Sequence, residues 1–164
     1  MSLRDRLEAK QRRRLVVPIQ VSDPTADYRD LAGVAHAREL AKERGAGEEE
    51  LAGLQTQMDE LAEKVKGHWV AVELQSLSAA EWEIAASNWQ TIEVNEDGPM
   101  AVMDWAEALA PLLAESCTDP GLKDAGWWAE QLAQEHWSEG DIEALRAAVL
   151  RLNVDAAGSQ APKD

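Results

Sequence analysis

Apolar and polar residues alternate in two short stretches of the chain, as expected for strands. Residues 15–21 form the first stretch, and Pro18 confines this predicted strand to a sheet edge because proline lacks the amide proton that a central strand needs. Residues 68–74 form the second stretch, for which a continuation of the preceding helix is the alternative. We expect the two strands to pair in a small ribbon.

Two helices are predicted between these strands. Asp23 and Pro24 are typical of an N-cap followed by proline at the first helical position, and Gly45 ends this helix as a C-cap glycine. Glutamates at positions 48–50 favour the positive N-terminal end of the second helix, which ends at Gly67.

The second helix carries an apolar seam with the 3-4 spacing of facing helices. The seam consists of Leu51, Leu54, Met58, Leu61 and Val65. Two interpretations stay open: the seam packs on the preceding helix through residues such as Leu31 and Ala35, or it is offered to a helix of another protein. We take the five seam residues as candidate partner-binding residues.

Two later helices begin with capping boxes. In each, a serine N-cap is followed at N3 by an acidic residue, and an apolar residue before the cap can pack on one at N4 as a hydrophobic staple. The first set is Leu77, Ser78, Glu81 and Trp82, and the second is Trp137, Ser138, Asp141 and Ile142. We interpret all eight residues as structural.

Turn residues and prolines predict the elements between these two helices. Residues 91–94 are interpreted as a short extended piece, and residues 95–98 as a turn. Pro99 is expected to open a helix that runs through Leu109. The last predicted helix ends at Asn153.

These elements predict a mainly α fold, α+β with a small β ribbon, in which a helical hairpin is followed by a C-terminal helical bundle. We divide the chain into a basic flexible arm at 1–14, an edge strand and helical hairpin at 15–67, a capped-helix domain with a short strand at 68–153, and a flexible tail at 154–164.

Composition favours helices and limits the class of protein. Hydrophobic residues make up 45% of the chain, with seven Trp and no Phe, so small residues and a few large anchors form the core. No apolar run reaches the roughly 20 residues of a membrane span. We expect no signal peptide because the N-terminus is charged, and the single cysteine, Cys117, fits a reducing cytoplasm.

The net charge of −15 is unevenly distributed. Residues 1–14 hold six basic and two acidic groups (+4), residues 15–67 hold six and 11 (−5), and residues 68–164 hold four and 18 (−14). A protein with this much negative charge repels nucleic acid and anionic membranes, so we expect neither as a partner. The acidity serves either solubility alone or a protein that keeps an apolar or basic partner in solution. We interpret the basic arm as a solvated terminus or partner-docking arm rather than a nucleic-acid tail.

No residue pattern indicates catalysis or the binding of a metal or cofactor. His36, His68 and His136 are scattered, Cys117 has no partner thiol, and a Gly-rich phosphate loop is missing. We therefore expect no enzyme, no cofactor and no metal site.

Several segments share their order and spacing with a known family. They are residues 70–74, 77–83, 109–117, 127–132 and 137–141, followed by Leu145 and Asn153. In this pattern, residues 68–153 resemble the tail assembly chaperones of long-tailed phages and prophages of actinobacteria. Residues 12–24 are similar to the N-terminal half of that family.

The resemblance implies a protein without enzymatic activity. Such chaperones bind the long, helical, apolar-rich tape measure protein in the host cytoplasm while the tail tube polymerises around it, and they leave before the virion matures. A frameshifted C-terminal extension recruits tail tube subunits in many phages. The seam around Met58 would suit a helix of the tape measure protein, because methionine adapts to varied surfaces.

Two other functions stay open on the sequence alone. One is a structural or scaffolding phage tail protein that remains in the particle. The other is an acidic charge-mimic inhibitor of a nucleic-acid-binding enzyme, motivated by the charge of −14 on residues 68–164. Mimicry needs carboxylates in rows on one face, whereas here they alternate with core positions. The oligomeric state is not indicated.

Overall fold

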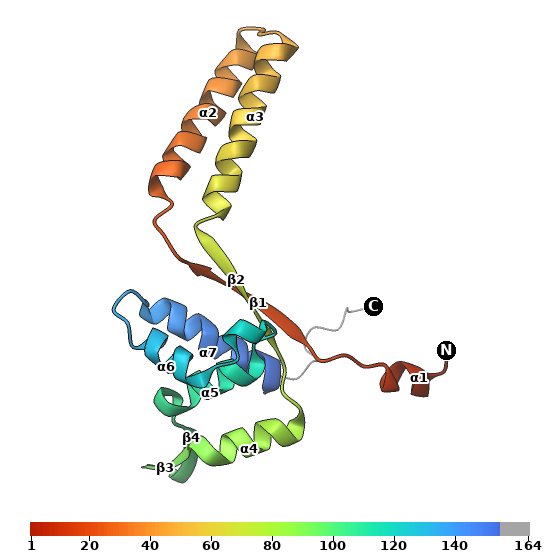
Figure 1. Cartoon of the computed structure of the whole chain (residues 1–164), viewed down its shortest axis with the longest axis vertical. Helices are drawn as coiled ribbons and strands as arrows, with labels where there is room; N and C mark the ends of the chain where they lie inside the picture. The colour runs from red at the N-terminus through yellow and green to blue at the C-terminus, as the bar shows by residue number, and fades with distance from the viewer. Residues whose placement is uncertain (155–164) are drawn as a thin grey trace. The chain divides into compact units, whose positions relative to one another are not determined.

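The computed structural model describes residues 1–154, which are mainly helical (Figure 1). These residues form seven α-helices, one short 3-10 helix and two small antiparallel sheets of two strands each, which confirms the predicted mainly α class with a small β part. The predicted tail at 154–164 lies, except for Val154, outside the described residues.

In chain order the elements are α1 (Leu3–Glu8), β1 (Arg14–Gln20), α2 (Thr25–Glu43), α3 (Glu48–Lys66), β2 (Trp69–Gln75), α4 (Ala79–Trp89), β3 (Gln90–Asn95), β4 (Gly98–Met103), α5 (Trp105–Ser116), the 3-10 helix η1 (Pro120–Leu122), α6 (Ala125–Leu132) and α7 (Glu139–Asn153).

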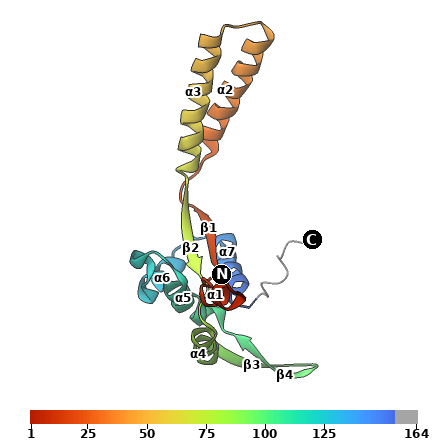
Figure 2. The same ribbon diagram turned by 90° about the vertical axis from the view of Figure 1, so that its right-hand side faces the viewer.

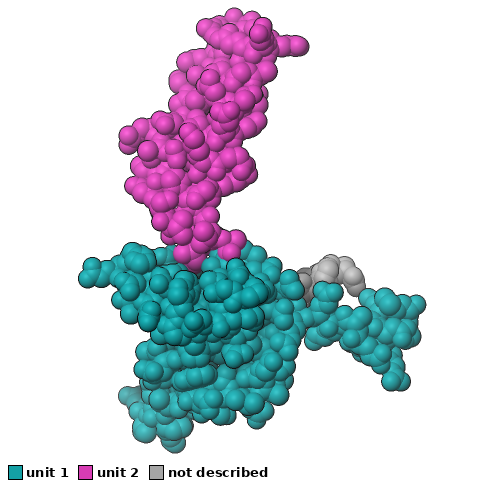
Figure 3. All heavy atoms as spheres, viewed as in Figure 1, with its two compact units in different colours: residues 1–17, 72–164 teal, residues 18–71 magenta. Residues whose placement is uncertain are grey.

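The chain divides into two compact units (Figure 3). Unit 2 is the continuous segment of residues 18–71, which contains α2 and α3. Unit 1 combines residues 1–17 with the chain from residue 72 onward, and it contains the other helices together with β3 and β4. Strands β1 and β2 each begin in one unit and end in the other.

In unit 2, α2 and α3 lie side by side and run in opposite directions (Figures 1 and 2). The turn between them depends on Gly45, whose φ of 75° is costly for other residues. The amide of Gly45 donates to the carbonyl of Lys42 at 3.0 Å, and the amide of Ala46 donates to the carbonyl of Ala41 at 2.9 Å. This is a Schellman motif, which satisfies the last carbonyls of α2 and reverses the chain.

The start of α2 differs by one residue from the prediction. The helix begins at Thr25 with Pro24 at its N-cap, so Asp23 lies just outside. The Asp23 carboxylate still accepts a hydrogen bond from the Thr25 amide at 2.9 Å. It therefore satisfies a free amide of the first turn, as a cap does.

Strands β1 and β2 pair with each other, as the two alternating stretches predict. The alternation holds along most of the ribbon, where the apolar side chains are buried, and fails at the end where Val21 bonds to His68. Val17, Ile19, Val72 and Leu74 are buried, whereas Val21 and Val70 are exposed.

Helix α5 is central to unit 1 because it packs against α4, α6 and α7. Leu112 and Leu113 of α5 are fully buried, as are Leu145 and Val149 of α7, so the two helices contribute to one core. Trp128 of α6 is also buried, and its indole Nε1 donates to the backbone carbonyl of Leu122 at 2.8 Å. The large ring thus enters the core without leaving a polar atom unsatisfied.

The helix expected to open at Pro99 is wrong in its first part. Residues 98–103 form strand β4, which pairs with β3 in a hairpin, and α5 begins only at Trp105. Gly98 has a φ of 109°, which lets the chain reverse after Asn95 and directs Pro99 into a strand. Proline is tolerated there because both strands of a two-stranded sheet are edges.

The N-terminal arm contains a short helix that the sequence pattern does not predict. Helix α1 spans Leu3–Glu8 and begins with a capping box in which the Ser2 hydroxyl accepts from the Asp5 amide. All of its residues are exposed, so local capping rather than packing holds it.

Candidate partner-binding site

The apolar seam lies on α3 and faces α2. Leu51, Leu54, Met58 and Leu61 are half-buried, and Val65 is buried. Leu31 and Ala35 of α2 are also half-buried. The seam is therefore used inside unit 2, but this contact covers it only in part.

The incomplete covering extends over both helices. Among the residues of α2 and α3, only Ala41 and Val65 are buried. Two antiparallel helices have one shared contact, so apolar residues at the margins of that contact stay open to solvent. A third helix laid along the pair would cover these margins.

A groove opens at the loop end of the two helices. It has a volume of about 700 Å³. Its apolar lining comes from Ala37, Leu40 and Ala41 of α2 and from Leu54 of the seam. Leu40 is 50% exposed although it is a large aliphatic side chain. Of the five predicted partner-binding residues, Leu54 is thus the one that this groove presents.

Charged side chains border the groove. Glu43, Arg44 and Glu50 line its edge, and the Arg44 guanidinium donates to the Glu50 carboxylate. This ion pair links the end of α2 to the start of α3 beside the loop. The lining of the groove thus combines apolar side chains with charged ones, as peptide-binding surfaces do.

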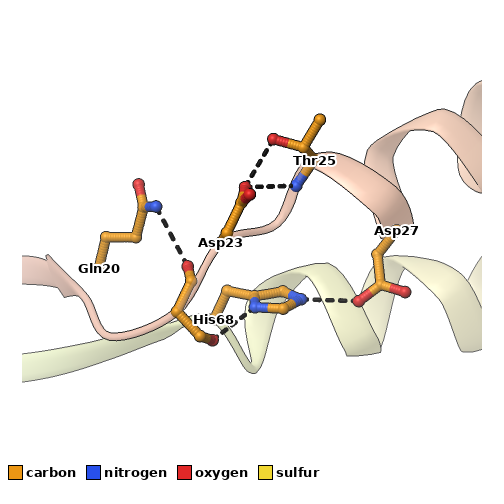
Figure 4. Close-up of polar contacts among 6 residues, drawn as sticks. Gln20, Asp23, Thr25, Asp27 and His68 are labelled. Atoms are coloured by element: carbon orange, nitrogen blue, oxygen red, sulfur yellow. Dashed lines mark hydrogen bonds and ion pairs between the residues drawn. The ribbon is translucent and has the colours of Figure 1, made fainter.

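At the other end of unit 2, His68 joins the two helices (Figure 4). Its Nε2 lies 2.6 Å from Oδ2 of Asp27 in the first turn of α2, and its Nδ1 lies 2.6 Å from the Ser22 hydroxyl. The amide of Val21 also donates to the His68 backbone carbonyl at 2.8 Å. We name Ser22, Asp27 and His68 the His68 clamp.

The His68 clamp contains the three residue types of a hydrolase triad, and the sequence pattern does not predict their meeting. In a neutral imidazole, one nitrogen donates and the other accepts, so His68 can donate to Asp27 and accept from Ser22. The groove lined by Leu40 and Leu54 lies at the opposite end of the two helices. We interpret the His68 clamp as structural, because it holds together the ends of α2 and α3 that no loop connects.

Both capping boxes are present in unit 1. The Ser78 hydroxyl accepts from the Glu81 amide at 3.1 Å, and the Glu81 carboxylate accepts from the Ser78 amide at 2.6 Å. Leu77 and Trp82 are half-buried and line one groove. The serine and the N3 residue therefore fix the start of α4, and the two apolar residues line the same groove.

The second box begins α7. The Ser138 hydroxyl accepts from the Asp141 amide at 3.1 Å, and the Ser138 amide donates to the Asp141 carboxylate at 3.2 Å. Ile142 is half-buried. The Trp137 ring lies edge-on to Trp128, with 6.2 Å between ring centroids, so this tryptophan contributes to aromatic packing of the core.

The hairpin of β3 and β4 exposes apolar residues that the sequence pattern does not single out. Ile92 and Val94 are 69% and 80% exposed. In the register of the hairpin they lie opposite Ala101 and Pro99, so all four side chains share one face. The sequence predicts a short extended piece at residues 91–94, but only the pairing with β4 shows that an apolar face of this hairpin is exposed.

The described part of the chain lacks two kinds of feature. Among residues 1–154, no group of three or more His, Cys, Asp or Glu side chains is arranged to hold a metal ion. Within the same residues, no helix combines the length and the apolar character that spanning a membrane requires.

Comparison with protein-family models, with curated proteins and with solved structures finds no match to this chain.

Proposed function

We propose that this chain is a phage tail assembly chaperone, which binds the tape measure protein and keeps it soluble while the tail tube assembles. In this proposal the protein is not an enzyme, acts in the host cytoplasm and is absent from the mature virion. The proposal combines the sequence resemblance with the geometry of unit 2.

The observation that carries the proposal is the incomplete covering of α2 and α3. Only Ala41 and Val65 are buried in these two helices, and an apolar groove lined by Leu40 and Leu54 opens between them. An amphipathic helix binds such a surface by placing its apolar face in the groove. A tape measure protein is helical and apolar-rich, so it supplies segments of this kind.

The finer architecture belongs to the same proposal. We assign the helical hairpin of α2 and α3 to partner binding and the C-terminal helical bundle to holding the complex in solution. The acidity supports this assignment, because residues 68–164 carry a charge of −14 that keeps complexes apart. A longer frameshifted form would add the contact with tail tube subunits.

The test is co-expression with the tape measure protein encoded in the same gene neighbourhood, followed by affinity purification and a solubility assay. We expect the tape measure protein to be soluble and to co-purify. The double variant Leu40→Asp with Leu54→Asp places two charges in the groove, so it should lose most of the bound tape measure protein.

Ile84→Asp is the matched control, because Ile84 is a 65% exposed aliphatic residue on α4 in the other unit. It should leave co-purification unchanged. A double variant that keeps its helical circular dichroism and still solubilises the tape measure protein would refute the proposed groove. An insoluble tape measure protein beside the wild-type chain would refute the chaperone function, and finding the chain in purified virions by mass spectrometry would favour a structural tail protein.

A further inference from the structure

A second groove lies within unit 1 and has a different chemistry. Its volume is about 580 Å³, within the range of small ligand and peptide sites. Three short segments form it: residues 10–13 after α1, residues 76–82 at the start of α4, and the last residues of α7.

The lining of this groove contains basic side chains and no carboxylate. Lys10, Arg12 and Arg13 line it. Arg12 pairs with Glu81 outside the lining at 3.1 Å, and the Arg13 guanidinium donates to the Leu152 carbonyl. Within the described residues, Lys10 forms no ion pair. Together with the Glu81 carboxylate that pairs with Arg12, these three cations still leave an excess of positive charge at the groove, in a chain of net charge −15.

The floor of the groove is apolar. Leu77 and Trp82 are half-buried and Leu152 is buried. Leu77 and Trp82 keep accessible surface against which one large apolar side chain of a ligand can be buried. The combination of an apolar floor with a basic rim selects a ligand that carries an apolar anchor between acidic groups.

Hydrogen bonds hold the three segments in place. The Ser76 amide donates to the Arg13 carbonyl at 2.8 Å, and the Leu77 amide donates to the Asn153 side chain at 2.7 Å. The N-terminal segment, the start of α4 and the end of α7 are therefore linked without any ligand. A preformed groove avoids the entropy loss of ordering its walls on binding.

We propose that this groove binds an acidic peptide segment of a partner protein, with a large apolar side chain on Trp82 and carboxylates beside Lys10 and Arg12. A second copy of this chain is disfavoured by mutual repulsion of two strongly negative molecules, and a nucleic acid is disfavoured by the acidic surroundings. The site lies in unit 1 and does not depend on the helix-binding role proposed for unit 2.

The test measures fluorescence anisotropy of fluorescein-labelled synthetic peptides with the full chain at low ionic strength. The probe has a central leucine and tryptophan flanked by glutamates. One matched peptide replaces the glutamates with lysines, and another replaces the central pair with glycine and serine. A single-stranded oligonucleotide carrying the same dye tests the nucleic-acid alternative.

The protein variant is Lys10→Glu, with Lys64→Glu as its matched control, because both lysines are exposed and Lys64 lies on α3 in unit 2. We expect only the glutamate peptide with its apolar centre to bind well, with Lys10→Glu weakening it about fivefold and Lys64→Glu leaving it unchanged. The proposal is overturned if both variants weaken binding equally or if no acidic peptide binds. It is also overturned if the peptide without the apolar centre binds as tightly as the probe, or if the oligonucleotide binds more tightly than the probe.

Discussion

The imidazole Nε2 of His68 lies 2.6 Å from Oδ2 of Asp27, although 41 positions separate the two residues in the chain. The contact ties the residue that follows α3 and Gly67 to the first turn of α2. The His68 side chain is 18% exposed and that of Asp27 is 28% exposed, so water competes only weakly for this bond. The two helices of unit 2 are thus fastened at both ends, by the loop and by this pair.

We expect His68→Ala to lower the free energy of unfolding by about 2 kcal/mol, because a partly buried carboxylate loses its hydrogen-bond donor. The measurement is urea denaturation followed by circular dichroism. His36→Ala is the control, because His36 is exposed on α2 of the same unit, and its effect should stay within about 0.5 kcal/mol.

A double-mutant cycle with Asp27→Ala separates the pair from the loss of each side chain. The effects of His68→Ala and Asp27→Ala should fall short of additivity by about 1 kcal/mol. Fully additive effects would show that the two residues act independently and would contradict the clamp.

The Asn153 side chain links the end of α7 to the segment before α4. Its Oδ1 accepts from the Leu77 amide at 2.7 Å, and its Nδ2 donates to the Val149 carbonyl at 2.8 Å. Asn153→Ala leaves the Leu77 amide without its partner, so we expect a loss of about 1–3 kcal/mol in the free energy of unfolding. Thermal and urea unfolding measure it, and Asn88→Ala at an exposed position of α4 is the control. Equal effects of the two substitutions would argue against the link.

Features that depend on neighbouring residues could be predicted from the sequence. The cap at Ser78 and the turn at Gly45 each need only a few adjacent residues, and both are present. The sequence does not predict the strand at residues 98–103, because Pro99 after a turn suits a helix start as well as an edge strand. Only pairing with β3 decides between them, and that pairing is a tertiary contact.

Contacts between distant segments could not be predicted. Arg12 lies 69 positions from Glu81, and Arg13 lies 139 positions from Leu152, so no local pattern relates them. The sequence shows the charge of the N-terminal arm but not the distant groups that accept its hydrogen bonds. The prediction therefore treats the arm as solvated. The candidate site shows the same difference between local and distant information. The spacing of apolar residues in the sequence predicts the seam that contains Leu54. How much of the seam is exposed depends on its packing against α2, which the sequence does not show.

Two glycine-to-alanine substitutions should have opposite effects. Gly98 adopts a φ of 109°, which strains any side chain, so Gly98→Ala should destabilise the β3–β4 hairpin by about 1 kcal/mol or more. Gly53 lies inside α3 with open space around its Cβ position, so Gly53→Ala should stabilise the protein by about 0.5–1 kcal/mol. Hydrogen exchange of hairpin amides reports the first change and thermal unfolding the second. Effects of the same sign would show that backbone conformation does not govern these positions.

The Cys117 thiol should be slow to react in the folded protein. Burial raises the pKa of the Cys117 thiol to about 11, an effect that nearby Lys123 only partly offsets. The reactive thiolate at pH 8 is then about a hundredfold rarer than for an ordinary cysteine, and the side chain is only 1% exposed. Iodoacetamide labelling followed by mass spectrometry should be much slower in buffer than in denaturant. Equal rates would mean that this part of the core opens readily.

The capping carboxylate of Glu81 should make the stability of α4 depend on pH. The Ser78 amide, then the Ser78 hydroxyl and Arg12, hold the pKa of Glu81 below its ordinary value of 4.5. The folded state therefore binds this proton less tightly than the unfolded state does. The stabilisation is complete above about pH 4.5 and is lost as the pH falls through the lowered pKa.

Glu81→Gln tests this dependence because glutamine keeps the cap acceptor and removes the charge. The variant should unfold at a lower temperature than the wild type at pH 7, and the two curves should converge as the pH falls below 4.5. Glu83→Gln removes a charge two residues away from the box, so its difference from the wild type should stay small at every pH. If the difference in unfolding temperature between Glu81→Gln and the wild type were the same in acid as at pH 7, the carboxylate would act through its shape rather than its charge.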